Sequence, residues 1–433
     1  MESQICIIGA GPAGLTAAIF AAQAGAKTVV IEKNTTAGRK LLLTGGGRCN
    51  LTHSGTIEDF IRAYGKQGRF LRHSLYEFSP DATREFFSQI GIETKIDEEG
   101  CVFPISERAG DVREALIGRC RETGVPLWHG HLGRALTGWK PVPQGVERIE
   151  KVNGHFQIYF AEELLTAEKV IIATGGVSYP TTGSTGDGYK LAKLLGHTII
   201  EPRPALVPLV VAEKWCADLA GTSLDNVTIS AMVDKKRVSV RGPVIFTHDG
   251  IGGPAVLDLS RLLADYLPAS ASLGEAGPAQ KPIEVAIDLV PAMNELKLEE
   301  YLMGRLSQYS KKFIANVLFD LVPKKLAVLI CNLAGITETT ASHLEKEQRR
   351  KIIQLLKKLP LSITATRPIE EATITRGGVS TAEIDPKTMQ SKICPGLFFA
   401  GEVIDVDGPC GGYNLQVCWS TAALAGKIQQ NRF

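Results

Sequence analysis

Three glycines near the start of the chain have the spacing of a phosphate-binding turn. Gly9, Gly11 and Gly14 form G-x-G-x-x-G between an apolar run and an Ala-rich stretch with helical spacing, and Glu32 ends the next apolar run. Such glycines let a pyrophosphate approach the N-terminus of a helix, and an acid at this distance accepts hydrogen bonds from ribose hydroxyls. Strand, helix, second strand and acid follow in this order, so the sequence predicts a dinucleotide-binding βαβ unit rather than a simple turn. Because Glu32 disfavours a 2′-phosphate, the dinucleotide is expected to be FAD or NAD.

Two later segments favour FAD. Residues 169–176, "KVIIATGG", form an apolar run ending in glycines, and residues 396–408, "GLFFAGEVIDVDG", form another that ends in an acidic, glycine-rich loop. One fingerprint near the start and one strand and loop near the end resemble flavoproteins of the two-dinucleotide-fold group. Either segment taken alone could be an ordinary strand with a turn.

A second glycine loop follows Glu32 closely. In "GRKLLLTGGGRCNLTH", residues 38–53, Arg39, Lys40 and Arg48 can contact phosphates or an anionic flavin, and Asn50 offers amide hydrogen bonds. The alternative is a surface loop with solvated charges. Its position after the fingerprint favours a loop that faces the cofactor.

The length and composition place these motifs in a multidomain globular protein. A chain of 433 residues with 44% hydrophobic and 22% charged residues and a net charge of +2 is expected to form two or three domains. Nine cysteines without a Cys-x-x-Cys pair fit neither a disulfide framework nor a zinc site, so we expect no metal and a reducing, cytoplasmic location. No apolar stretch approaches the roughly 18 residues that span a bilayer. We therefore expect no membrane segment.

Changes of periodicity suggest an inserted middle. Prolines 202, 204 and 208 mark a boundary, short β segments follow, and helical spacing takes over near residue 293 before β character returns after Pro360. We expect an α/β fold with a Rossmann-like FAD-binding domain in two parts, residues 1–203 and 363–433. Between them we expect a β-barrel-like domain, residues 204–292, and a basic helical subdomain, residues 293–362.

Longer blocks carry a specific resemblance. The segments "VSYPTTGSTGDGYKLAKLLGH", "VIFTHDGIGGPAVLDLSR", "TITRGGVSTAEIDPKTMQSK" and "GLFFAGEVIDVDGPCGGYNLQ", with the second glycine loop, follow one another through nearly the whole chain. In this the chain resembles the BaiN/RdsA-type family of bacterial NAD(P)/FAD-dependent oxidoreductases, which includes the aminoacetone-oxidase-like and YhiN-like flavoproteins. The resemblance implies reduction of an activated C=C bond, either of uridine in 23S rRNA to dihydrouridine or of a conjugated enone related to dehydro bile acids. It also implies NAD(P)H as a transient electron donor.

The motifs and the resemblance together nominate positions that line FAD. These are Gly9, Gly11, Pro12, Ala13, Gly14, Glu32, Lys33, Arg39, Lys40, Gly46, Gly47, Arg48, Asn50, Thr174, Gly175, Gly401, Glu402, Gly411, Gly412, Tyr413, Asn414 and Leu415. We expect the "CGGYNLQ" segment to begin the last helix and to direct amides of residues 411–414 at the flavin.

A proton donor is needed as well as a hydride donor to reduce a C=C bond. Cys410 lies beside the expected flavin and could supply the proton. The alternative is a small buried cysteine that packs under the loop. The resemblance also implies threonine at this position in some members of the family, which argues against an obligatory role. Tyr413, His248 and Asp249 are further candidates, although His248 could equally bond a turn.

A local charge excess points to RNA. Residues 303–360 contain eleven basic and four acidic side chains, an excess of seven in a nearly neutral protein. Such a run is often only a solvated face, but phosphate neutralisation supplies most sequence-independent affinity for RNA. We expect 23S rRNA to bind through Arg349, Arg350, Lys351, Lys357 and Lys358, with residues 234–241 extending the patch. A non-catalytic, flavin-dependent RNA-binding protein is a third hypothesis.

Overall fold

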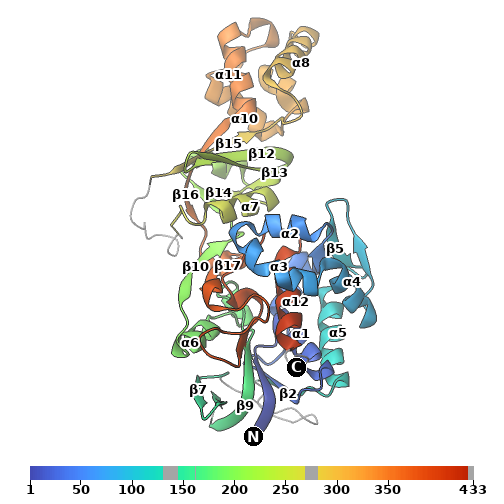
Figure 1. Cartoon of the computed structure of the whole chain (residues 1–433). Helices are drawn as coiled ribbons and strands as arrows, with labels where there is room; N and C mark the ends of the chain where they lie inside the picture. The colour runs from blue at the N-terminus through green and yellow to red at the C-terminus, as the bar shows by residue number, and fades with distance from the viewer. Residues whose placement is uncertain (130–144, 161, 269–280, 428–433) are drawn as a thin grey trace. The chain divides into compact units, whose positions relative to one another are not determined.

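A computed structural model describes residues 1–129, 145–160, 162–268 and 281–427 (Figure 1). The chain divides into two compact units. The first joins the two ends of the chain, Met1–Arg203 with Thr373–Phe433, and the second is Pro204–Ala372.

The first unit is built on a seven-stranded sheet whose core is parallel. Its strand order is β6-β2-β1-β9-β8-β7, and β18 also pairs with β9. The parallel strands are β1 (Glu2–Ile8), β2 (Thr28–Glu32), β6 (Leu127–His129), β9 (Glu163–Ile172) and β18 (Leu397–Phe399). β7 (Arg148–Val152) and β8 (His155–Phe160) are antiparallel. The carboxyl ends of β1, β2, β9 and β18 therefore share one edge, where ligands of open α/β sheets bind.

Two helices from opposite ends of the sequence pack together in this unit. α1 (Pro12–Gln23) begins with Pro12, which favours the first helical turn, and α12 (Tyr413–Gly426) is buried on nearly every side. A Cβ on Gly426 would lie 2.6 Å from the Ala17 carbonyl oxygen, so the two helices approach closely (Figure 1). The sequence pattern predicts a last helix over residues 416–430. α12 begins three residues earlier, at Tyr413, and residues 428–430 lie outside the described residues.

Shorter elements complete the first unit. The helices are α2 (Ile57–Ala63), α3 (Gly68–Glu77), α4 (Pro80–Gln89), α5 (Ala109–Glu122) and α6 (Asp187–Leu194). The strands are β3 (Thr52–His53), β4 (Thr94–Ile96), β5 (Cys101–Pro104), β10 (Ile199–Ala205) and β17 (Ile374–Val379), of which the last two form a pair.

The second unit is a closed barrel with a helical insertion. The barrel order is β11-β14-β13-β12-β15-β16. Its strands are β11 (Leu209–Val211), β12 (Ser223–Val233), β13 (Lys236–Phe246), β14 (Gly250–Gly252), β15 (Ile283–Asp288) and β16 (Leu359–Thr366), with α7 (Pro254–Leu263) after β14. Between β15 and β16 come α8 (Glu295–Gln308), α9 (Ile314–Val317), α10 (Lys324–Ala334) and α11 (Lys346–Lys357). The predicted fold class, a Rossmann-like α/β domain with an inserted barrel and helices, is confirmed.

Within the described ranges, no helix has both the length and the apolar character needed to cross a membrane.

Candidate functional site

The first glycine turn joins β1 to α1 and leaves one position open. A Cβ on Gly14 would lie 1.8 Å from the Gly9 carbonyl oxygen, and one on Gly9, whose φ is +100°, would lie 2.6 Å from the Ala173 oxygen. Both glycines are therefore required by the protein's own backbone. A Cβ on Gly11 would meet no atom within 4 Å, so the absence of a side chain there keeps space free beside the start of α1.

Glu32 at the end of β2 holds the glycine turn. Its side chain is 8% exposed and accepts hydrogen bonds from the Ala10 N–H at 2.7 Å and the Asn34 N–H at 2.8 Å. Arg39 is exposed and donates to Asn34 Oδ1 at 3.2 Å. The acid thus orders both the turn and the segment that follows β2.

Lys33 connects the end of β2 to the segment before α6. Its ammonium group pairs with Asp187 and donates to Thr185 Oγ1. A Cβ on Gly188 would lie 2.0 Å from Thr174 Oγ1, which is buried and accepts no hydrogen bond from the described residues. The nominated Thr174 therefore lies against α6, at the end of β9.

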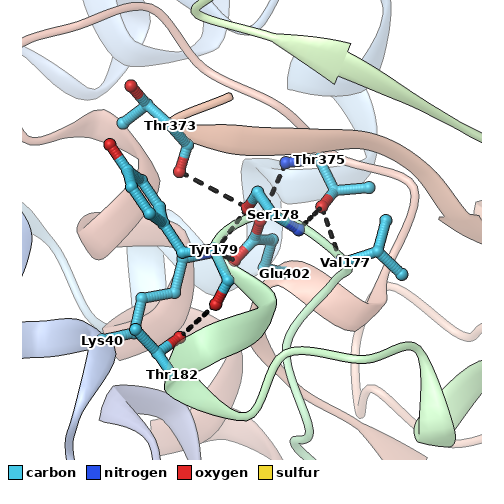
Figure 2. A network of polar contacts seen from close by, with 8 residues as sticks. All are labelled: Lys40, Val177, Ser178, Tyr179, Thr182, Thr373, Thr375 and Glu402. Atoms are coloured by element: carbon cyan, nitrogen blue, oxygen red, sulfur yellow. Dashed lines mark hydrogen bonds and ion pairs between the residues drawn. The ribbon is translucent and has the colours of Figure 1, made fainter. Parts of the chain in front are cut away.

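A half-buried ion pair links the second glycine loop to the segment after β18, the last strand (Figure 2). Lys40 Nζ lies 2.8 Å from Glu402 Oε2 and donates to Ser178 Oγ at 2.6 Å. The Ser178 hydroxyl and the Thr375 N–H in turn donate to Glu402 Oε1. Burial opposes the charge on Glu402, but Lys40 and these donors outweigh it, so the pKa of Glu402 is lowered. The carboxylate is ionised at neutral pH and anchors three segments that are distant in sequence.

The Thr375 hydroxyl extends this network to the loop after β9. Thr375 Oγ1 accepts from the Val177 N–H at 2.8 Å and the Ser178 N–H at 3.1 Å (Figure 2). A Cβ on Gly176 would lie 2.3 Å from the same oxygen. Neither Ser178 nor Thr375 is among the nominated positions, although both lie in the "VSYP" and "TITRGG" segments that carry the resemblance.

The C-terminal loop docks on the first glycine turn and on β3. A Cβ on Gly401 would lie 2.7 Å from the Ala13 Cβ, and one on Gly412 would lie 2.4 Å from the Thr52 carbonyl oxygen. Asn414 clamps the same loop, since its Oδ1 accepts from the Gly408 N–H at 2.8 Å and its Nδ2 donates to the Gly408 oxygen at 2.9 Å. Nominated residues from both ends of the chain therefore meet beside α1 and α12, with Leu415 buried in the first turn of α12.

Aromatic rings surround the start of α12. The Tyr413 ring stacks on the His53 ring with centroids 5.0 Å apart, and its centroid lies 4.8 Å from that of the Phe60 ring. The backbone carbonyl of Tyr413 accepts a hydrogen bond from the Tyr64 hydroxyl. The position of a Cβ on Gly411 is 3.3 Å from His53 and 3.8 Å from the Cys101 sulfur. Cys410 and Cys101 are half-buried, whereas the other seven cysteines are buried. His53 and Cys101 had no chemical signal in the sequence, because only the fold brings them to this loop.

The second glycine loop has left-handed backbone at Gly45, Gly46 and Gly47, with φ of +57°, +67° and +90°. Arg48 is exposed and its guanidinium lies 4.2 Å from the centroid of the Phe103 ring. Asn50 Oδ1 is buried without a hydrogen-bond donor among the described residues, and it would lie 2.7 Å from a Cβ on Gly412. Asn50 is thus a free acceptor beside the first turn of α12.

A fully buried carboxylate lies further along the same C-terminal loop. Asp407 is 1% exposed, and its Oδ1 lies 3.6 Å from Arg376 Nη1 on β17. This pair has no signal in the sequence, because an isolated Arg in "TRGG" and an isolated Asp in "DVDG" have no spacing that relates them.

Gly175, with φ of +73°, lies in the first unit, where a Cβ would be 3.3 Å from Ser184 Oγ, whereas His248, Asp249 and the nominated basic residues lie in the second unit. His248 is exposed on the turn between β13 and β14, and Asp249 pairs with Arg367 at 2.6 Å, so their proposed roles stay predictions. Two of the five basic residues expected to meet RNA are bound internally. Arg349 is 17% exposed and lies 3.6 Å from Glu299 Oε1, and Lys357 is 11% exposed, pairs with Asp288 and donates to two carbonyls. Arg350, Lys351 and Lys358 are exposed.

Comparison with known proteins identifies the family. The sequence matches the family described as HI0933-like protein Rossmann domain over residues 3–428. It is 32% identical over 433 residues to the 3-dehydro-bile acid delta(4,6)-reductase of Clostridium scindens, over 99% of this chain and 100% of that protein. It is 31% identical over 427 residues to the ribosomal RNA dihydrouridine synthase of Haemophilus influenzae, over 97% of this chain and 96% of that protein.

A solved structure shares the fold at low identity. The 3-ketosteroid delta1-dehydrogenase of Sterolibacterium denitrificans is similar over 99% of each chain, with a TM-score of 0.50 and 12% sequence identity. The family match over nearly the whole sequence agrees with the resemblance noted from its motifs, and the chain belongs to the HI0933-like family.

Proposed function

We propose that this chain is an FAD-dependent reductase of an activated C=C bond and that its substrate is a uridine of 23S rRNA. The observation that carries the proposal is the meeting of the first glycine turn, the end of β9 and the Gly401–Gly412 loop beside the N-termini of α1 and α12. A dinucleotide that reaches from the first of these segments to the last would be held by both ends of the chain.

The residues present fit FAD. Gly11 leaves space at the start of α1, where unpaired N–H groups favour a pyrophosphate, and Glu32 is buried beside it as a ribose acceptor. Asn50 Oδ1 is a buried acceptor with no donor among the residues that the structure describes. FAD bound here would supply a hydride to one carbon of the double bond, after receiving it from NAD(P)H.

The chain's own residues would orient the reactants and move the proton. The N-terminus of α12 places its first N–H groups at the Gly411–Gly412 loop, which favours an anionic group there. Asn414 fixes the backbone before that loop through its two hydrogen bonds to Gly408, and the Lys40–Glu402 pair anchors the segment after β18. The half-buried Cys410, directly before Gly411, would hold the proton for the second carbon on its thiol.

The named relatives support the reaction class and divide on the substrate. One is a bile-acid reductase and another a ribosomal RNA dihydrouridine synthase, at 32% and 31% identity. The exposed basic residues of the helical insertion favour RNA. The full-length similarity to the bile-acid reductase supports a small conjugated enone as the second candidate.

Anaerobic single-turnover mixing separates the candidates. The FAD bound to the protein is reduced under argon until it is colourless. The reduced protein is then mixed with unmodified 23S rRNA fragments or with a conjugated 3-ketosteroid. The proposal expects flavin absorbance to recover with RNA, and one uridine to gain two hydrogens by mass spectrometry. Recovery with the enone alone would establish the second candidate, whereas purified protein that takes up no FAD would contradict both.

A further inference from the structure

An aromatic and basic loop joins α8 to α9 in the second unit. It consists of Tyr309–Phe313, and the Phe313 side chain is 49% exposed. The half-buried Tyr309 ring lies 3.9 Å from Lys312 Nζ and 4.5 Å from the Arg305 guanidinium carbon, measured to the ring centroid. We call residues 309–313 the aromatic loop.

The backbone of the aromatic loop is fixed by a neighbouring segment. The Ala341 N–H donates to the Lys312 oxygen at 2.9 Å, and the Ser342 N–H donates to the Ser310 oxygen at 3.0 Å. Phe313 also forms an antiparallel bridge with Thr340. The exposed Phe313 ring is therefore held on an ordered backbone. A partner that stacks on the ring then loses little free energy to ordering the loop.

The charges of the loop are available to a partner. Lys311 and Lys312 are exposed and form no ion pair with any residue in the described ranges. The nearby carboxylate of Asp320 is already paired with Arg305. This differs from Arg349 and Lys357 on α11, whose charges are used within the protein.

We propose that the aromatic loop binds an unpaired stretch of RNA, with a base stacked on Phe313 and backbone phosphates at Lys311 and Lys312. The inference rests on the proposed function, because RNA is the substrate assigned there. Aromatic rings that stack on bases, flanked by cations that contact phosphates, are the means by which proteins bind single strands. Reduction of a uridine ring also requires an unpaired base, so a contact for single-stranded RNA suits that substrate.

Fluorescence anisotropy with a labelled single-stranded 23S rRNA fragment tests the inference. Phe313→Ala is expected to weaken binding by roughly tenfold or more. The double variant Lys311→Gln with Lys312→Gln should lose two phosphate contacts. Each contact on a single strand contributes about 0.7 to the slope of log binding constant against log salt concentration, so the magnitude of that slope should fall by about 1.4. Thermal unfolding and circular dichroism establish that each variant is folded.

Matched variants control for loss of charge and of apolar surface. Lys27→Gln with Lys193→Gln removes two exposed charges outside the insertion, and Leu296→Ala truncates a side chain that is 72% exposed. The controls should keep wild-type affinity, and a duplex of the same sequence should bind more weakly than the single strand. Equal affinities of loop variants and wild type would overturn the inference while leaving the proposed function in place. Failure of the wild-type protein to bind any RNA would overturn both.

Discussion

Lys40 Nζ lies 2.8 Å from Glu402 Oε2, although 362 positions separate the two residues in the sequence. The pair ties the loop after β2 to the segment after β18, and the hydroxyl of Ser178 joins both (Figure 2). The two parts of the first unit, Met1–Arg203 and Thr373–Phe433, are thus joined by this ion pair as well as by the pairing of β18 with β9.

Glu402→Gln should therefore destabilise the first unit. The substitution leaves the Lys40 ammonium, on a side chain that is 20% exposed, without its counter-charge, at a cost of about 2 kcal/mol in the free energy of unfolding. Urea unfolding measures this change. Glu107→Gln, which breaks the exposed ion pair with Lys95, is the matched control and should have little effect. Equal stabilities of the two variants would contradict a buried anchoring role for Glu402.

Gly412→Ala should disturb the proposed cofactor site by a steric clash, in addition to the strain of a side chain at positive φ. The new Cβ would lie 2.4 Å from the Thr52 oxygen, so β3 or the start of α12 must shift. Gly124→Ala also introduces a side chain at positive φ, but with no atom within 4 Å, and should cost only about 1 kcal/mol. We expect FAD affinity, measured by flavin fluorescence, to fall more than tenfold in Gly412→Ala and to remain unchanged in Gly124→Ala. Unchanged FAD affinity in both would remove the α12 N-terminus from the proposed site.

The sequence predicted the fold and the local motifs well because both depend on short-range patterns. Gly9, Gly11, Gly14 and Glu32 have fixed spacings within one βαβ unit, and the changes of periodicity mark the barrel and the helices. Contacts between distant segments have no such pattern. The sequence could not predict that Lys40 pairs with Glu402. The ion pairs of Arg349 with Glu299 and of Lys357 with Asp288 likewise depend on how the helices of the insertion pack with one another and with the barrel.

The stability of the first unit should fall as the pH drops below neutral, because of a buried histidine. His197 is 3% exposed, with Nδ1 lying 3.1 Å from Glu383 Oε2 and Nε2 lying 2.8 Å from Ser391 Oγ. Burial lowers the pKa of His197 below 6.5 and outweighs the attraction of Glu383. The unfolded chain then binds the proton more tightly than the folded one, so stability is full above pH 6.5 and is lost as the pH falls through the folded-state pKa.

His197→Gln should flatten this dependence. Unfolding free energies from urea titrations at pH 7.5, 6.5 and 5.5 should decline less in the variant than in the wild type. His155→Gln, which removes an exposed imidazole, controls for loss of a histidine. A variant that declines as steeply as the wild type would assign the acid sensitivity to other groups, such as Glu402, whose pKa is also lowered.

Cys410→Ala should slow the reoxidation of the flavin by substrate without slowing the reduction of the flavin by NAD(P)H. If the thiol donates the proton, reduction of bound flavin by NAD(P)H should proceed at the wild-type rate, because that step needs no proton from the protein. Reoxidation of the flavin by the unsaturated substrate should slow by roughly a hundredfold or more, the usual contribution of a positioned general acid. Cys101→Ala tests the other half-buried thiol at this loop and should leave reoxidation fast. If Cys410→Ala reoxidises as fast as the wild type, the proton must come from another group at the loop, and Tyr413→Phe becomes the next variant to measure.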